Sequence, residues 1–77
     1  MSLRDDPEIQ RLAAHSDELR RLLQEHAELD KKVTALDKRH VRTPAEEMER
    51  KQLSKHKLAS RDRIARLAGE LKKQFPA

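Results

Sequence analysis

The chain of 77 residues has no cysteine, tryptophan or tyrosine, and it has only one phenylalanine, one glycine and three prolines. Without cysteine, neither a disulfide framework nor a thiolate metal site can stabilise it. A single glycine excludes a glycine-rich phosphate-binding loop. A chain this small buries only about 60% of the surface that its unfolded form exposes. We therefore expect oligomerisation to supply the stability that a thin core lacks.

Long apolar runs are also missing. The chain begins Met-Ser-Leu-Arg-Asp-Asp, without the apolar run of a secretory signal, and no run reaches the length of a membrane span. We expect a cytoplasmic protein that does not cross a membrane. Lys and Arg alternate with Leu and Ile in the second half, but the lack of aromatic residues argues against binding to a membrane surface.

The residues that are present favour α-helix. Charged residues make up 42% of the chain and hydrophobic residues 35%, a balance that raises the possibility of disorder. However, Leu, Ala, Glu, Lys, Arg and Gln predominate, and these are the strongest helix formers. Together with regular apolar spacing, this composition is typical of coiled coils. The fold class predicted is all-α.

The first predicted helix spans residues 7–40, after a lead-in over residues 1–6. Asp6 and Pro7 form a helix start. A three-four spacing then predicts a coiled-coil seam, with Ile9 and Leu23 beside it at e positions. The seam members are Leu12, His15, Leu19, Leu22, His26, Leu29, Val33, Leu36 and His40.

The second predicted helix spans residues 44–75, after a turn at residues 41–43. Thr43 is the expected cap, Pro44 takes the first helical position, and Glu46 completes a capping box. So short a turn predicts that the second helix runs back antiparallel to the first. Residues 1–77 then form a single helical hairpin. Its second helix carries Met48, Leu53, Ile64, Leu67, Leu71 and Phe75 on the apolar face.

The apolar stripe is wider than one partner helix covers, because Ile9 and Leu23 extend it beyond the narrow seam. We expect two hairpins to dimerise into a four-helix bundle about a twofold axis, although trimers and larger bundles fit the pattern too. The expected core and oligomer seam consists of Leu12, Leu19, Leu22, His26, Leu29, Val33, Leu36, Leu53, Ile64, Leu67 and Leu71.

Charge is distributed unevenly between the two helices. Residues 1–49 hold 9 basic and 12 acidic residues, whereas residues 50–77 hold 9 basic and 2 acidic residues. Opposite signs favour pairing of the two helices with each other. The basic half also suggests contacts with nucleic acid, for which Arg61, Arg63 and Arg66 are the candidates. Its basic residues do not fall on one side of the helix, and no Tyr or Trp is available to stack on bases.

Three histidines, His15, His26 and His40, fall on the predicted seam. They fit neutral imidazoles at the interface, or groups that set the register and loosen the assembly when protonated near pH 6. An oligomer mass unchanged between pH 7 and 5.5 would exclude the second interpretation. Their spacing does not favour a metal site, since none are four residues apart. No nucleophile has an evident base, so the sequence predicts no enzyme, cofactor or metal.

The order of residues in both halves resembles the YdcH-like family of small bacterial proteins. In the first half the resemblance rests on Leu22, His26, Ala27, Glu28, Leu29, Asp30, Lys31, Lys32, Val33 and Leu36, and in the second on Leu53, Lys55, Lys57, Leu58, Asp62 and Ile64, with Arg61 in place of Lys. Ser54 stands where the family has Lys, and Ser60 where it has an apolar residue. The resemblance covers roughly residues 9–71. It implies a cytoplasmic bacterial helical hairpin of unknown function, without catalytic residues to carry over.

Within the matching stretch, Asp30 lies at an e position of the seam, where we expect it to pair with a basic group on the second helix or on another subunit.

These observations together predict a small self-associating interaction or scaffold protein. It is expected to form a homo-oligomer, a dimer above other states, and to meet an unidentified protein partner. The alternative is a nucleic-acid-binding hairpin that uses its basic second helix. Steep loss of binding with rising salt would identify that alternative.

Overall fold

The computed structural model describes residues 3–76 and is all-α, with no strand among these residues. A short 3-10 helix, η1 (Leu3–Asp5), precedes α1 (Pro7–Ala13), α2 (Asp17–Asp37) and α3 (Pro44–Gln74). The molecule measures 47 × 17 × 16 Å. This length matches the roughly 45 Å expected of a helix of about 30 residues. All-α structure, predicted from the composition, is confirmed.

The first predicted helix is broken, which corrects the expectation of one helix over residues 7–40. α1 ends at Ala13, and α2 begins at Asp17 after Ser16 adopts an extended backbone. The Ser16 hydroxyl accepts a hydrogen bond from the Leu19 amide at 3.1 Å, so Ser16 is an N-cap. Asp17 and Glu18 add negative charge to the first turn, where the helix dipole favours it. The local start signal therefore overrides the three-four spacing that runs through it.

α2 also ends earlier than predicted, at Asp37 rather than at residue 40. The following helix begins where the sequence indicates. The Thr43 hydroxyl accepts from the Glu46 amide at 3.1 Å, and a Glu46 carboxylate oxygen accepts from the Thr43 amide at 3.0 Å. This is the predicted capping box, with Pro44 at the first helical position. The connection between α2 and α3 therefore spans residues 38–43.

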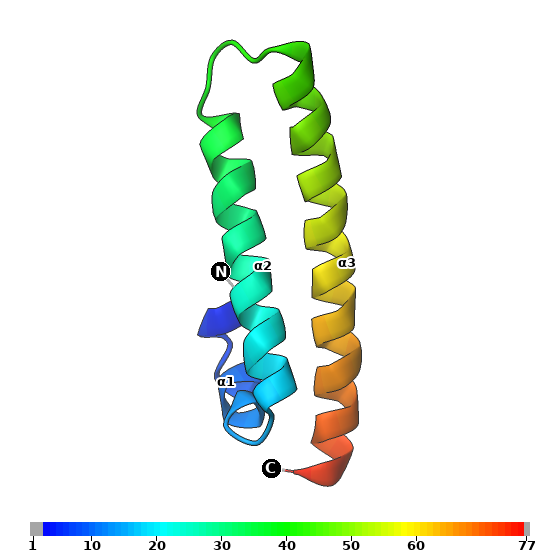
Figure 1. Cartoon of the computed structure of the whole chain (residues 1–77). Coiled ribbons are helices and arrows are strands. Elements are labelled where there is room, and N and C mark those ends of the chain that lie inside the picture. Colours follow the sequence, from blue (N-terminus) through cyan, green and yellow to red (C-terminus); the bar gives the residue numbers. More distant parts are fainter. Residues whose placement is uncertain (1–2, 77) are drawn as a thin grey trace.

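α2 and α3 lie side by side along the long axis and run in opposite directions, and α1 lies beside the N-terminal half of α2 (Figure 1). The buried core sits at this three-helix end. It combines residues of α1, the first part of α2 and the last part of α3: Ile9, Leu12, Ala13, Leu19, Leu23, Ile64, Ala68 and Leu71. Leu12 and Leu19 are fully buried. Apolar burial is the main stabilising term, so this end holds most of the stability.

α1 covers part of the wide apolar stripe from within the chain. Ile9 and Leu23, the two e-position residues that widen the stripe, are 8% and 7% exposed and belong to the same core cluster. The width that we expected a second chain to cover is thus partly covered by α1, which the turn at residues 14–16 places against α2. Any contact surface for another molecule has to lie elsewhere on the rod.

The C-terminal end of α3 is fastened to the turn between α1 and α2. The Arg11 guanidinium donates to the Phe75 carbonyl oxygen at 2.7 Å. The His15 ring stacks on the Phe75 ring, with centroids 4.3 Å apart and planes 9° apart. Glu8 Oε2 also lies 3.2 Å from Lys72 Nζ. These contacts join α1 and the turn after it to the end of α3, beside the buried core.

Candidate interaction surface

The predicted seam residues divide into two groups by burial. Leu12, Leu19, Val33, Ile64 and Leu71 are buried. The other six are only half-buried in the single chain: Leu22, His26, Leu29, Leu36, Leu53 and Leu67. A second set of apolar side chains is exposed outright, namely Val41 at 87%, Met48 at 64% and Leu58 at 61%. The structure thus leaves apolar surface along α2 and α3 beyond the three-helix end.

The three seam histidines separate in the structure. His15 lies in the turn after α1 and is exposed, and His40 lies beyond the end of α2 and is also exposed. Both placements correct the predicted seam, because the heptad count assumed an unbroken helix. His26 stays on the seam, half-buried, and its Nδ1 atom is buried without a hydrogen-bond partner among the described residues. A pH-dependent assembly therefore remains a prediction that involves His26 alone.

Ion pairs join the acidic first half of the chain to the basic second half. Lys57 Nζ lies 2.5 Å from Asp30 Oδ1. The hydrogen bond from Lys57 and its positive charge lower the pKa of Asp30 below its ordinary value. Arg50 pairs with Asp37, and this contact raises the pKa of the guanidinium. The predicted pairing of Asp30 and the predicted attraction between the helices are both confirmed.

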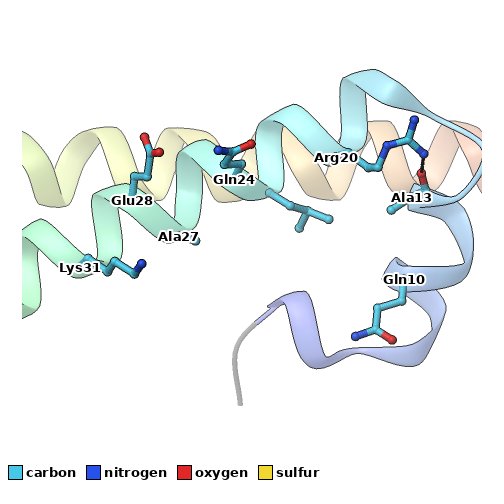
Figure 2. A pocket seen from close by; sticks show the side chains of 8 residues that line it. Gln10, Ala13, Arg20, Gln24, Ala27, Glu28 and Lys31 are labelled. Atoms are coloured by element: carbon cyan, nitrogen blue, oxygen red, sulfur yellow. Dashed lines mark hydrogen bonds between the residues drawn. The ribbon is translucent and has the colours of Figure 1, made fainter.

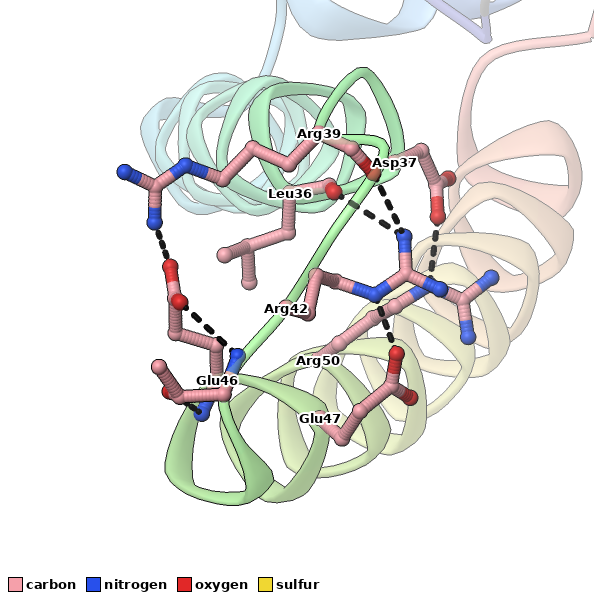
Figure 3. Close-up of polar contacts among 8 residues, drawn as sticks. Leu36, Asp37, Arg39, Arg42, Glu46, Glu47 and Arg50 are labelled. Atoms are coloured by element: carbon pink, nitrogen blue, oxygen red, sulfur yellow. Dashed lines mark hydrogen bonds and ion pairs between the residues drawn. The ribbon is translucent and has the colours of Figure 1, made fainter.

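Polar contacts, not apolar packing, organise the connection between α2 and α3. Arg42 donates to the Leu36 carbonyl oxygen at 3.1 Å and pairs with Glu47 (Figure 3). Arg39 pairs with Glu46, the acid that also closes the capping box. The Leu36 carbonyl oxygen also accepts from the Arg39 amide at 3.2 Å, so Arg42 adds a second donor at the end of α2. The network contributes contacts at an end of the molecule where the large apolar residues Val41 and Met48 are exposed.

A groove runs between α1 and the outer side of α2 (Figure 2). It is lined by Gln10 and Ala13 from α1 and by residues of α2 that include Leu23, Gln24, Ala27 and Lys31. Arg20 crosses its end, donating to the Ala13 carbonyl oxygen at 2.7 Å and pairing with Asp17. Arg20 thereby ties the end of α1 to the start of α2. The groove marks the flank of the rod that α1 occupies.

A second groove lies on the same general side, where η1 approaches α2 and α3. We call it the Leu58 groove. It has a volume of about 760 Å³, and Leu3, His26, Val33, Ser54, Leu58 and Arg61 line it together with the Asp30 and Lys57 pair. The pair already satisfies the charges in its middle. What remains is a shallow apolar wall around Leu58 and Val33.

The opposite flank carries what we call the leucine strip, formed by Leu22 and Leu29 of α2 with Ala59, Ser60 and Leu67 of α3. Its three leucines are half-buried. Leu22 and Ala27, which lines the α1 groove, lie about 140° apart around α2, so the strip faces away from α1. Glu18 and Glu25 border the strip on α2, and Arg63, Arg66 and Glu70 border it on α3.

The three arginines proposed for nucleic acid do not share one surface. Arg61 lines the Leu58 groove, whereas Arg63 and Arg66 border the leucine strip. Arg61 and Arg63 differ by two positions, which is about 200° around a helix. A single basic stripe, as would follow a phosphate backbone, does not form from these three residues.

Several core residues were missed because they are small. Ala13 and Ala68 are buried in the main core, and Ser60 is buried at 7% exposure. The Ser60 hydroxyl has no hydrogen-bond partner among the residues described. Ser60 lies seven residues from both Leu53 and Leu67, so the heptad spacing already placed it on the apolar face. Ser60 was not counted among the core residues because its side chain is polar.

Within residues 3–76, His, Asp and Glu side chains do not gather in groups of three that could hold a metal ion. No helix in this part of the chain is both long enough and apolar enough to span a membrane. The geometry offers open grooves and a strip of leucines, which are surfaces for contact.

Residues 19–68 match a family described as a protein of unknown function (DUF465). The chain belongs to this family. It is the YdcH-like family that the sequence resembles. The match runs from the first buried leucine of α2 to Ala68 of α3. It thus includes the connection between α2 and α3, the Asp30–Lys57 and Asp37–Arg50 pairs and the leucine strip, but excludes α1. No curated protein and no solved structure matches the chain.

Proposed function

We propose that this member of the DUF465 family is a non-catalytic interaction protein, built as an antiparallel coiled-coil hairpin that self-associates into a four-helix bundle. The observation that carries the proposal is the leucine strip. Leu22, Leu29 and Leu67 remain half-exposed on the flank that α1 leaves uncovered. Burying that strip against a second hairpin would continue the apolar core along the rod, as in other helix bundles.

The surface chemistry supports a contact role over a catalytic one. The grooves are shallow, and their charged residues either pair with each other or lie apart. Enzyme sites usually need a concave pocket in which several reactive groups converge. The cytoplasmic location, bacterial source and homo-oligomeric state stay predictions of the sequence. A further protein partner would bind surface that the bundle leaves free.

Two exposed alanines on α3 provide a matched test of the strip. Ala59 lines the strip, whereas Ala65 lies about 120° away around α3 and lines none of the grooves described above. Ala59→Glu puts a charge into the proposed interface without removing a core side chain. Sedimentation velocity should show that Ala59→Glu reduces association, whereas Ala65→Glu leaves it unchanged. Circular dichroism serves as the control that both variants remain helical.

Equal association of the two variants and the wild-type chain would exclude the leucine strip as the contact surface.

Nucleic-acid binding is the second candidate, resting on the net charge of +4 and the basic second half. It predicts a complex with DNA or RNA that dissociates as the salt concentration rises. Loss of the complex in Arg61→Gln but not in Arg63→Gln would show that the flank with the Leu58 groove binds the nucleic acid, and the reverse result would point to the leucine strip.

A further inference from the structure

Charges of opposite sign border the leucine strip and are not used within the chain. Glu25 borders it on α2 and Arg63 on α3, and both side chains are exposed. Over residues 3–76 neither of them has an ion-pair or hydrogen-bond partner, and the same holds for Glu18 and Arg66. The charges that join the helices elsewhere, such as Asp30 and Lys57, are paired.

The ion pairs fix the register between α2 and α3. Asp37 lies against Arg50 and Asp30 against Lys57, so a step of seven residues back along α2 corresponds to seven forward along α3. Continuing this register puts Glu25 at the level of Asp62. Arg63 and Arg66 are within about one helical turn of that level. Acid and base thus flank the strip at the same height along the rod.

We propose that two copies join through their leucine strips about a twofold axis parallel to the rod, so that α2 of each copy packs against α3 of the other. This arrangement rests on the proposed self-association and specifies its geometry. An axis along the rod keeps both copies at the same height, so Glu25 of each copy faces Arg63 and Arg66 of the other. Glu70 is the one acid that borders the strip on α3.

The alternative twofold arrangement is disfavoured by charge. An axis perpendicular to the rod inverts the height of the second copy, so it would set α2 against α2 with Glu18 of each copy facing Glu25 of the other when the axis lies midway between these residues. It would also set α3 against α3, with Arg63 of each copy close to Arg66 of the other. Like charges across a helix interface oppose association. In both arrangements each helix has antiparallel neighbours on both sides, the topology of an up-down four-helix bundle, so the charges distinguish the two arrangements.

The size of the face fits a stable dimer. One long face of the molecule measures 47 by 17 Å. That is roughly 800 Å² before side-chain relief is counted, close to the about 800 Å² that each partner contributes to a standard interface. A second copy that packs along this whole face, of which the strip is one part, therefore reaches the standard size and covers the leucines of the strip.

Single charge reversals distinguish the two arrangements. In full-length protein, Glu25→Arg and Arg63→Glu each replace an attractive contact with a repulsive one twice per dimer. Each should raise the dimer dissociation constant roughly tenfold or more. Mixing the two variants should restore tight association, because the new Arg at 25 then meets the new Glu at 63 in one half of the heterodimer and the native Glu25 meets the native Arg63 in the other half. The matched controls, Glu28→Arg on α2 and Arg61→Glu on α3, change the same charges off the strip and should associate as the wild type does.

The outcomes separate this geometry from the proposed function. A wild-type chain that stays monomeric at every concentration removes both. If the wild type associates but Glu25→Arg and Arg63→Glu behave like their controls, self-association stands and the proposed packing is wrong. If each reversal tightens association, the α2-against-α2 arrangement is the true one. If dimer association is weaker in Glu25→Arg and in Arg63→Glu alone, and recovers when the two variants are mixed, the packing of α2 against α3 is supported.

Discussion

Lys57 on α3 and Asp30 on α2 lie 2.5 Å apart, nitrogen to oxygen, midway along the two helices. The Asp30 side chain is 52% exposed and that of Lys57 35% exposed, so water screens the pair. Exposed pairs contribute at most about 1 kcal/mol to the free energy of unfolding. The main value of the contact is the register that it sets between α2 and α3.

Asp30→Asn should lower the free energy of unfolding at pH 7 by at most about 1 kcal/mol. Lys57 lowers the pKa of Asp30 in the folded chain, whereas the unfolded value is about 3.9. The stabilisation is therefore fully present above pH 5 and is lost as the pH falls through the lower, folded pKa. Urea denaturation of both proteins at pH 7 and pH 3 measures this. A difference that grows on acidification would contradict the assignment.

Ser60→Ala should raise the free energy of unfolding by about 1 kcal/mol. The Ser60 hydroxyl is buried on α3 without a hydrogen-bond partner in the described chain, and a buried unsatisfied polar group costs about 1–3 kcal/mol. Ala also has the higher helix propensity. Thermal unfolding by circular dichroism tests this, with half-buried Ser54→Ala as the comparison for propensity alone. An equal gain in both variants would show that burial of Ser60 has no cost.

Gly69→Ala should stabilise the chain by up to about 1 kcal/mol, because Gly is the poorest helix former after proline. Gly69 lies inside α3, and a Cβ atom added there meets nothing within 4 Å. Its backbone has no positive φ that would require glycine. Urea unfolding measures the gain. A loss of stability would mean that another molecule or chain approaches the backbone at this position.

Ser16→Ala should lower the free energy of unfolding by about 1 kcal/mol, since the N-cap of α2 is lost. Ser16→Asp keeps an acceptor at this position and should retain the stability. Hydrogen exchange gives the more local readout, because the Leu19 amide loses its acceptor in the alanine variant. Unchanged stability and exchange in Ser16→Ala would contradict the N-cap and favour a continuous helix through residues 14–16.

The sequence predicted features that depend on local chemistry or on long regular spacing. The start of α3 followed from Thr43, Pro44 and Glu46, whose capping box is present. The pairing of Asp30 followed from its heptad position and from the opposite charges of the two halves. The capping box depends only on adjacent residues, and the Asp30 pair depends on its heptad position and on the opposite charges of the two halves, all of which can be read along the sequence.

The missed features arise where a local signal and the heptad spacing disagree. Ser16, Asp17 and Glu18 mark a helix start within an apolar pattern that continues through it, and the start signal prevailed. The fold of α1 over α2 then removed His15 from the seam and placed Ile9 in the same core cluster as Leu23. That packing depends on a turn and on contacts between distant residues, so a count along one helix could not reveal it.

The proposed function depends on self-association through the leucine strip, which sedimentation equilibrium of the wild-type chain measures. We expect the weight-average mass to rise from 9.0 kDa, the mass of one chain, towards twice that value as concentration increases about a hundredfold. A mass that stays at 9.0 kDa throughout, with a cooperative melting transition independent of concentration, would contradict it.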